Sequence, residues 1–487
     1  MDQHVDHCDE KVKVLEQCQV SPLAGCLPPT SLPLSFLDLP WLYCDTLQSI
    51  FFYDFPHSRD HFLQTLLPIL KHSLSLTLQH FFPFVGTLVI PTKPHFPHIL
   101  YSHGDSITLT VAESATDHFS RLVADTARDV RDSHPFVPVL PKPSTSQDGA
   151  LLLRLMAIQL TIFPNSGYSI CITFNHTVAD GRSFLHFMKF WSSLCRSKCD
   201  STCPQALPCL NREIIKDPKG LMLDCLEILW SSPKERIVKE LPNVVDNNNK
   251  VRCVFVLSRD HVEKLKKWVF DECKSYELDS ESFHISTFVV TSALMWVCLV
   301  RSEEPNDGNI FNNDEIYELL FLADCRNRGE FSIPSTYFGN CIVSRTVSLV
   351  RNKLIRDNGI VEAVVGIGSE VKGFQFDAMK NVESFMHASA RPGPGPPNPL
   401  VIAGSPKIGS YETDFGWGKP KKCELLQIER SRTISLSDCK NDEGGVEVGL
   451  VLGRAQMSNF SAIFKEYIEN IPLSLSKVGQ GDKDVLK

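Results

Sequence analysis

The sequence contains no apolar run of the ~20 residues that a membrane-spanning helix needs. Its first twenty residues, MDQHVDHCDEKVKVLEQCQV, are polar and acidic. They lack the basic start and the apolar centre of a secretory signal peptide. We therefore expect a cytoplasmic protein without a membrane partner.

Acidic residues outnumber basic residues. The chain has 57 Asp and Glu residues against 49 Lys and Arg residues, which gives a formal net charge of -8 and a pI of about 6.1. Proteins that bind nucleic acid generally present a basic face to the phosphates, so this balance argues against such a partner. The expected partner is a small molecule.

Several motifs for nucleotides, hydrolysis and metals are missing. There is no GxxxxGK[ST] phosphate loop, no GxGxxG fingerprint, no GxSxG nucleophile elbow and no HExxH zinc helix. The 17 cysteines include a group at Cys195, Cys199, Cys203 and Cys209, but this group lacks the C-x2-C pairs of a zinc ribbon. We expect reduced thiols that pack as small hydrophobes, and no bound metal.

The segments that are present predict both strands and helices. Two strand-like runs, residues 150–163 and 168–174, are joined by PNSG, whose Asn165 and Gly167 favour a hairpin. Further on, SFLHFMKFWSSL repeats apolar residues at helical spacing. Residues 31–42 are apolar and contain prolines, which predicts an irregular packing segment.

Length and composition favour more than one domain. At ~150 residues per domain, the 487 residues suggest two or three. Prolines and a DNNNK patch mark a linker in the middle of the chain. We predict an N-terminal domain at residues 1–205, a crossover linker at 206–249 and a C-terminal domain at 250–487. Both domains mix helices and strands without regular βαβ alternation, so we predict an α/β protein with mixed sheets.

One short stretch, FNHTVADGRS at residues 174–183, places a histidine four residues before an aspartate. His176 follows an apolar strand, and Gly181 precedes a helical pattern, so HTVADG is predicted to connect a strand to a helix. Such connections often present functional side chains on a rigid scaffold. The alternative is structural: His176 is hydrogen-bonded in the core and Asp180 caps the next helix.

Two later segments bear on this choice. Residues 414–418 are DFGWG, and residues 337–341 are YFGNC. HxxxD, YFGNC and DFGWG, in this order and in a chain of this length, resemble the plant BAHD acyltransferases. They are most similar to the clade that acylates anthocyanins and other phenolic glucosides. The similarity extends from near residue 35 to the final helix, which is nearly the whole chain.

The resemblance implies two chloramphenicol-acetyltransferase-like domains with the active-site channel between them. It also implies acyl-CoA as co-substrate and no permanently bound cofactor. In such enzymes the histidine that matches His176 takes the proton of an acceptor hydroxyl, which then attacks the thioester directly. Asp180 points away from the channel and pairs with an arginine, either Arg326 or Arg328. Gly181 permits a sharp turn.

Other site residues are also implied by the resemblance. We place Asp414 with His176 among the catalytic residues, because loss of Asp414 should disturb the channel. The expected role of its carboxylate is to anchor a loop and not to transfer a proton. Trp417 packs in that loop on the CoA side. Asn340 either lines the channel or holds a turn. Ala403 stands where related enzymes carry a threonine that can donate a hydrogen bond to the oxyanion. An alanine side chain cannot donate, so the donor is expected to be the backbone, Ser405, Asn340 or water.

The acyl donor is the remaining question. The clade uses malonyl-CoA or hydroxycinnamoyl donors such as coumaroyl-CoA and caffeoyl-CoA. A malonyl carboxylate needs a cation, which Arg182 or Lys407 can supply. We expect a monomeric malonyltransferase that acylates a sugar hydroxyl of a flavonoid, anthocyanin or other phenolic glucoside. A hydroxycinnamoyl transferase for the same acceptors is the alternative, and a non-catalytic binding protein of this fold is a more distant one.

Overall fold

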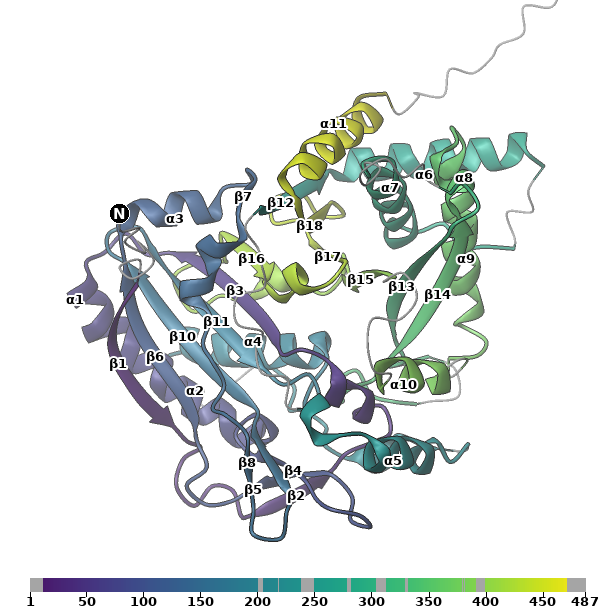
Figure 1. The fold of residues 1–487 in the computed structure, drawn as a ribbon. Coiled ribbons are helices and arrows are strands. Elements are labelled where there is room, and N and C mark those ends of the chain that lie inside the picture. The colour runs from purple at the N-terminus through teal and green to yellow at the C-terminus, as the bar shows by residue number, and fades with distance from the viewer. Residues whose placement is uncertain are drawn as a thin grey trace, which may run out of the picture.

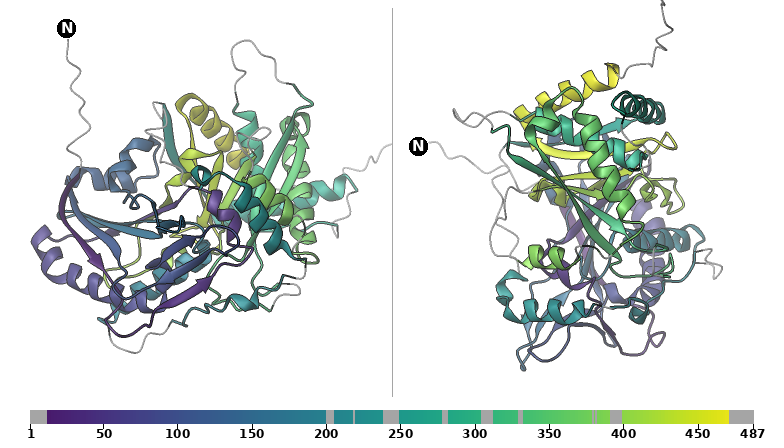
Figure 2. Two further views of the ribbon diagram at one scale, coloured as in Figure 1. Left: turned by 60° about the horizontal axis from the view of Figure 1, so that its bottom comes forward. Right: turned by 90° about the vertical axis from the view of Figure 1, so that its right-hand side faces the viewer.

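The N-terminal and C-terminal halves of the chain occupy opposite ends of the molecule, as the purple-to-blue and green-to-yellow segments show (Figures 1 and 2). No helix in the described part of the chain is both long and apolar enough to cross a membrane. This computed structural model describes residues 12–199, 205–217, 219–237, 249–277, 282–303, 312–328, 332–378, 380, 382–390 and 399–470.

A six-stranded sheet forms the centre of the N-terminal half. Strands β10 and β11 pair in antiparallel register from Met156↔Phe174 to Phe163↔Gly167, which confirms the predicted hairpin. Its turn places Asn165 at a φ of 61°, a conformation that asparagine tolerates better than most residues. The strand order is β1 (Val12–Val20), β6 (Ile107–Ser114), β10 (Met156–Phe163), β11 (Gly167–Phe174), β3 (Leu47–Asp54) and β16 (Lys422–Leu425).

A smaller sheet lies beside it and corrects one prediction. The strand predicted at residues 150–163 breaks at Leu155, because β9 joins the smaller sheet and β10 joins the larger one. The break frees the Leu155 carbonyl to accept a hydrogen bond from Asn175 N at 2.9 Å, next to the histidine motif. The order is β2 (Thr30–Pro33), β5 (His98–Tyr101), β4 (Thr87–Ile90), β9 (Leu151–Arg154) and β8 (Ser144–Thr145).

Helices complete the N-terminal half. In α4 the Trp191 indole N–H donates to the Leu70 carbonyl of α2 at 3.2 Å, so the two helices are fixed side by side. Residues 31–42, which were predicted to be irregular, contain most of β2 and the start of a short 3₁₀ helix, η1 (Leu39–Tyr43). The helices are α1 (Arg59–His61), α2 (Leu67–His80), α3 (Thr116–Val123), α4 (Gly181–Arg196) and α5 (Leu221–Ser231).

A seven-stranded mixed sheet forms the C-terminal half. Its strand order is β14 (Ile342–Val350), β13 (Ile316–Asp324), β15 (Leu400–Gly404), β17 (Thr433–Asp438), β18 (Val446–Gly453), β12 (Lys250–Leu257) and β7 (Arg128–Asp129). Helix α7 is buried along nearly its whole length between α6, α9 and α11. The helices are α6 (Arg259–Ser275), α7 (Thr287–Arg301), α8 (Arg351–Ile355), α9 (Gly359–Gly373), α10 (Val382–Ala390) and α11 (Arg454–Asn470).

The two halves exchange strands. Strand β7, from the N-terminal half, pairs with β12 of the C-terminal sheet, and β16, from the C-terminal half, pairs with β3. Arg128 of β7 and Glu424 of β16 form an ion pair in which both side chains are 3% exposed. A cut anywhere in the predicted linker therefore leaves one strand of each half in the other sheet, and the predicted domain bounds stay a prediction.

The predicted linker is more ordered than its composition indicates. It contains α5, and Cys209 forms an isolated bridge with Tyr337. Arg212 in the same segment is buried. Prolines and polar residues hid this helix from the sequence pattern, and residues 238–248 of the segment lie outside the described part of the chain.

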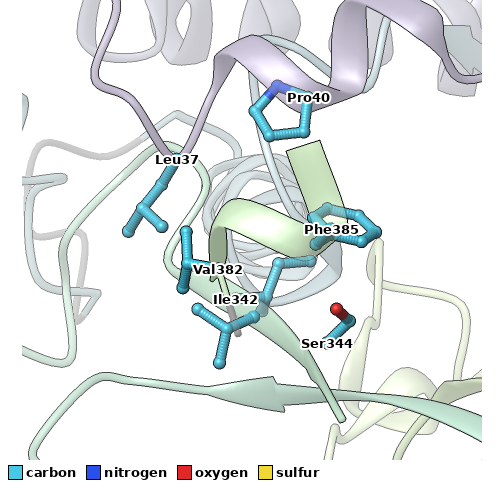
Figure 3. A pocket seen from close by; sticks show the side chains of 7 residues that line it. Leu37, Pro40, Ile342, Ser344, Val382 and Phe385 are labelled. Atoms are coloured by element: carbon cyan, nitrogen blue, oxygen red, sulfur yellow. The ribbon is translucent and has the colours of Figure 1, made fainter. Parts of the chain in front are cut away.

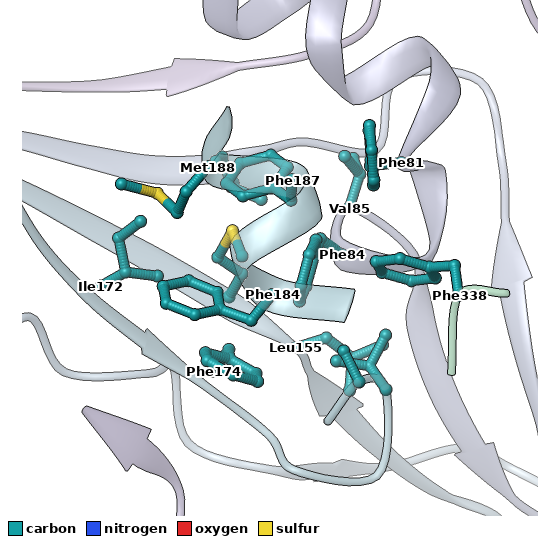
Figure 4. Close-up of a cluster of buried hydrophobic side chains, with 14 of the residues drawn as sticks. Phe81, Phe84, Val85, Leu155, Ile172, Phe174, Phe184, Phe187, Met188 and Phe338 are labelled. Atoms are coloured by element: carbon teal, nitrogen blue, oxygen red, sulfur yellow. The ribbon is translucent and has the colours of Figure 1, made fainter. Parts of the chain in front are cut away.

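Phenylalanine side chains of the N-terminal half pack with Phe338 of the YFGNC segment (Figure 4). Phe174, at the end of β11, stacks on Phe184 of α4 with ring centroids 4.7 Å apart. Phe84 contacts both Phe174 and Phe338 of the YFGNC segment, at 5.5 and 5.3 Å. Such aromatic burial anchors the start of α4 against the C-terminal half.

Candidate active site

His176 lies in the short connection between β11 and α4, as the sequence predicted. The connection is tightened by Asn175, whose side-chain oxygen accepts from Thr177 N at 2.9 Å and whose carbonyl accepts from Val178 N at 3.1 Å. The histidine is 7% exposed. It is therefore held by a loop with few degrees of freedom, at the end of a central strand.

Asp180 faces away from the imidazole, and both of its oxygens are occupied. Oδ1 accepts from Ser183 N at 2.9 Å and so caps α4, while Oδ2 accepts from Cys341 N at 3.0 Å. Arg326 Nη1 lies 2.9 Å from Oδ2. Between the two arginines proposed from the sequence, the structure therefore pairs Arg326 with Asp180, whereas the guanidinium of Arg328 lies over the Phe374 ring at 5.2 Å.

The ion pair with Arg326 stabilises the charged form of Asp180. Burial opposes ionisation of the Asp180 carboxyl, but the Arg326 guanidinium and the N–H groups of Ser183 and Cys341 hold its pKa below its ordinary value. Asp180 is thus a buried carboxylate that orients the loop and the first turn of α4. It is not hydrogen-bonded to His176.

Trp41, which the sequence analysis did not single out, covers one face of the imidazole. The two rings stack with centroids 3.8 Å apart and an interplanar angle of 14°. Trp41 lies in η1, and Phe385 of α10 lies 5.3 Å from its ring. The stretch LDLPWLY contained this aromatic residue, but only the tertiary fold brings it to His176.

A small apolar cavity of about 10 Å³, room for about one water molecule, lies beside Phe385 (Figure 3). Phe385 is part of its wall, and Pro40 precedes the stacked tryptophan. The pocket carries no charged side chain among its lining residues. Its walls are formed by Leu37, Pro40, Ile342, Val343, Ser344, Val382 and Phe385.

Burial lowers the pKa of the His176 imidazole to about 4. The backbone carbonyl of His176 and the Asn340 side chain, which can accept hydrogen bonds from the charged ring, oppose this shift in part, as do the charges of Asp180 and Asp38. At neutral pH the ring is therefore uncharged. A neutral imidazole can accept a proton, which is what a general base requires.

This pKa predicts the acid limit of activity. We expect kcat/KM to be constant near neutrality and to fall with a midpoint near pH 4, because protonation removes the base. An unperturbed histidine would place the midpoint near ~6.5. Initial rates across this range, at each pH where the native tryptophan fluorescence persists, check the prediction. A midpoint close to the unperturbed value would contradict it.

Asp414 and Trp417 lie in a separate loop. Asp414 Oδ1 accepts from Gly416 N at 2.8 Å and Gly418 N at 3.0 Å, and Oδ2 lies 3.9 Å from Arg196. Arg196 ends α4, which places it ~22 Å along the helix from the His176 loop. Asp414 therefore anchors its own loop, and an effect on the channel stays a prediction.

The glycines of DFGWG are required by their backbone. Gly416 and Gly418 have φ angles of 102° and 101°, which other residues rarely adopt. Trp417 between them is half-buried and contacts Phe55 with ring centroids 6.0 Å apart. Both findings agree with a structural loop.

Gly181 does not need the freedom of glycine. It is the first residue of α4 and is not among the glycines with positive φ. A Cβ at this position would meet only Ile408 Cδ1, at an ordinary contact distance of 3.5 Å. The predicted sharp turn is therefore made by Asp180, which caps the helix, and not by Gly181.

The two cations proposed for a malonyl carboxylate differ in their surroundings. Arg182 Nη1 lies 2.8 Å from Asp324 Oδ2, and the Arg182 side chain is 48% exposed. Lys407 is exposed, and its N–H donates to Ser405 Oγ at 3.3 Å. Asn340, by contrast, is fully buried behind His176. Arg182 is thus already neutralised, and Ser405 supports a turn.

Comparisons with known proteins identify the family. The family model described as the Transferase family matches residues 11–467. Coumaroyl-CoA:anthocyanidin 3-O-glucoside-6''-O-coumaroyltransferase 1 of Arabidopsis thaliana is 37% identical over 467 residues, which covers 94% of this chain and 97% of the relative. Malonyl-coenzyme A:anthocyanin 3-O-glucoside-6''-O-malonyltransferase of Dahlia pinnata is 33% identical over 466 residues, with the same coverage of both chains.

The fold has solved relatives as well. The crystal structure of vinorine synthase superposes with a TM-score of 0.65 at 18% identity, covering 92% of this chain and 96% of that one. The family model and the curated relatives identify an acyltransferase. The chain belongs to the Transferase family, the BAHD acyltransferases that its motifs resemble. Its co-substrate is an acyl-CoA, as in that family.

Proposed function

We propose that the protein transfers an acyl group from CoA directly to a sugar hydroxyl of a phenolic glucoside, with His176 as the general base. The observation that carries this proposal is the state of the imidazole. The ring is buried, stacked on Trp41 and uncharged at neutral pH, and it stands at the end of a rigid loop. The names of the two curated relatives support the class of acceptor.

The proposed reaction needs no covalent intermediate on the protein. The acceptor oxygen attacks the thioester carbonyl while His176 Nε2 takes its proton, so a C–O bond forms as negative charge develops on the carbonyl oxygen. Collapse of this intermediate breaks the C–S bond. The protonated imidazole then returns the proton to the departing sulfur, and CoA leaves as a thiol. General base catalysis of this kind contributes ~10²–10⁴ in rate.

For the donor, we propose a hydroxycinnamoyl group in place of the malonyl group expected from the sequence. The rings of Trp41 and Phe385, whose centroids lie 5.3 Å apart, offer an apolar contact for an aromatic acyl group beside the imidazole. A malonyl carboxylate needs a cation; of the two predicted from the sequence, Arg182 is paired with Asp324, and Lys407 lies in an exposed turn after Ser405. The curated relatives include both kinds of donor, so they support the family activity and leave this choice to experiment.

We expect the purified protein to show a kcat/KM for coumaroyl-CoA at least about tenfold above that for malonyl-CoA, with a flavonoid 3-O-glucoside as acceptor. Burial of ~60 Å² of ring surface at ~25 cal/mol per Å² provides about 1.5 kcal/mol, which is roughly this factor. Product formation is measured by mass spectrometry. A malonyl preference that disappears in Arg182→Gln would contradict the donor proposal.

A further inference from the structure

The Trp41 ring is held in place by its own segment and by a helix of the C-terminal half. The residue is 5% exposed, and its backbone N–H donates to the Asp38 carbonyl at 3.3 Å, where η1 begins. The Asp38 side chain is fixed in turn, because its Oδ1 accepts from Asn340 N at 2.9 Å. Phe385 of α10 packs against the indole with ring centroids 5.3 Å apart. The contact between Trp41 and His176 is therefore supported from both halves of the chain.

The proposed reaction creates a positive charge where there is little water. When His176 takes the proton of the acceptor hydroxyl, its ring becomes an imidazolium, and the residue is only 7% exposed. Burial disfavours the charged form of a side chain. A neighbouring group that stabilises the imidazolium therefore lowers the barrier of this step.

The two carboxylates whose charges favour the imidazolium, Asp180 and Asp38, are engaged elsewhere. Asp180 Oδ2 lies 2.9 Å from Arg326 Nη1. Asp38 Oδ2 lies 3.5 Å from Arg212 Nε. Neither carboxylate is hydrogen-bonded to the imidazole, and each has an arginine that offsets its charge. Their attraction for the imidazolium is correspondingly weakened.

The indole face of Trp41 is in direct contact with the ring that becomes charged. The two ring centroids lie 3.8 Å apart and the planes are 14° from parallel. The face of an aromatic ring carries negative electrostatic potential, and it attracts a cation that lies within about 6 Å of its centroid. Tryptophan attracts cations most strongly among the aromatic side chains, and the attraction is larger where water is excluded.

We propose that Trp41 is a positioning residue that stabilises the imidazolium form of His176 through the face of its indole ring. The contact holds the plane of the neutral imidazole before the reaction and attracts the ring once it is charged. The proton passes from the acceptor oxygen to His176 and then to the departing sulfur, and Trp41 exchanges none. This inference rests on the proposed role of His176 as the base.

Fluorinated tryptophan tests the proposal without removing the ring. One, two or three fluorine atoms on the indole withdraw electrons from its face and change its shape little, so a packing role alone would not respond. We expect kcat to fall with each fluorine, roughly tenfold over the series, with KM changed less than about twofold. The label enters all six tryptophans. In Trp41→Phe it enters only the other five, and kcat of that variant should stay within about twofold along the series.

Substitutions give a second measurement. Trp41→Leu should lower kcat roughly tenfold, and Trp41→Phe, which keeps an aromatic face, should lower it about threefold. Trp268→Leu is the matched control, because Trp268 is a partly buried tryptophan of α6 that packs on the C-terminal core. It should leave kcat within about twofold of wild type. A constant kcat along the fluorinated series, or an equal fall in the Trp41→Phe background, would overturn the inference.

A readout that does not depend on turnover separates this inference from the proposed function. ¹⁵N spectra of histidine-labelled protein, with His176→Gln to assign the resonances, follow protonation of the His176 ring. The midpoint should fall by about one pH unit across the fluorinated series, because the imidazolium loses stabilisation. An unchanged midpoint would overturn the inference. A wild-type protein without transferase activity would refute the proposed function instead.

Discussion

Replacing His176 with alanine should lower kcat by at least about 100-fold, because a general base contributes ~10²–10⁴ in rate. The loss should appear with any acyl-CoA that the wild type accepts. KM for the acyl-CoA should change little, since the imidazole acts on the acceptor hydroxyl. The fold should persist, because the loop is held by Asn175 and Asp180 and not by the ring. Initial rates and thermal denaturation measure these effects together.

His186→Ala is the matched control for this experiment. His186 lies on α4, where its ring bonds the Ala206 carbonyl at 2.7 Å and packs against Phe81 with ring centroids 5.3 Å apart. Its replacement should leave kcat within about twofold of wild type, which corresponds to less than about 0.5 kcal/mol in activation free energy. If His176→Ala retained most of the wild-type rate, the imidazole could not be the base.

Replacing Asp180 with alanine should produce the largest loss of stability, about 3–5 kcal/mol in the free energy of unfolding. The substitution leaves the Arg326 guanidinium, which is fully buried, with only Asp324 as a carboxylate partner, at 3.0 Å. It also removes the cap of α4 and the acceptor of Cys341 N. Denaturant titration at neutral pH measures the change.

The contribution of Asp180 depends on pH in a defined direction. Because its folded pKa lies below its ordinary value, its stabilisation is present above the unfolded pKa of ~3.9 and is lost as the pH falls through the folded pKa. Glu16→Gln is the control, since it breaks an exposed pair with Lys71 and should cost no more than about 1 kcal/mol. Equal losses of unfolding free energy for the two variants would contradict the stabilising role of the Asp180–Arg326 pair.

Local sequence patterns predicted much of the fold. The hairpin of β10 and β11 followed from alternating apolar residues and a PNSG turn, and the start of α4 followed from its apolar spacing. The break at Leu155 was not visible, because it depends on which strand lies beside each half of residues 150–163. The exchange of β7 and β16 was hidden for the same reason: pairing partners are far apart in sequence.

The site was predicted only in part. HxxxD located His176 and Asp180, and the choice between Arg326 and Arg328 required their positions in space. Trp41 lies in a segment whose pattern predicted only packing, since an aromatic residue in an apolar run carries no sign of the ring it will cover. Asp38, in the same segment, was not singled out either, because the sequence does not show which residues will surround its carboxylate.

Charge at the site shows the limit of sequence reasoning most clearly. Arg182 follows the catalytic loop and was a reasonable partner for an acidic donor. The structure pairs it with Asp324, 142 residues away. A sequence shows that a cation is near a motif, but not whether another side chain has already neutralised it.

The central claim is direct transfer from acyl-CoA to a glucoside hydroxyl. It is tested most directly by mass spectrometry of both protein and products after mixing with coumaroyl-CoA, or with malonyl-CoA, in the presence and absence of a flavonoid 3-O-glucoside. The account predicts an acylated glucoside and an equal amount of CoA when the acceptor is present, with the protein mass unchanged. CoA release without acceptor, or an acyl adduct on the protein, would contradict it.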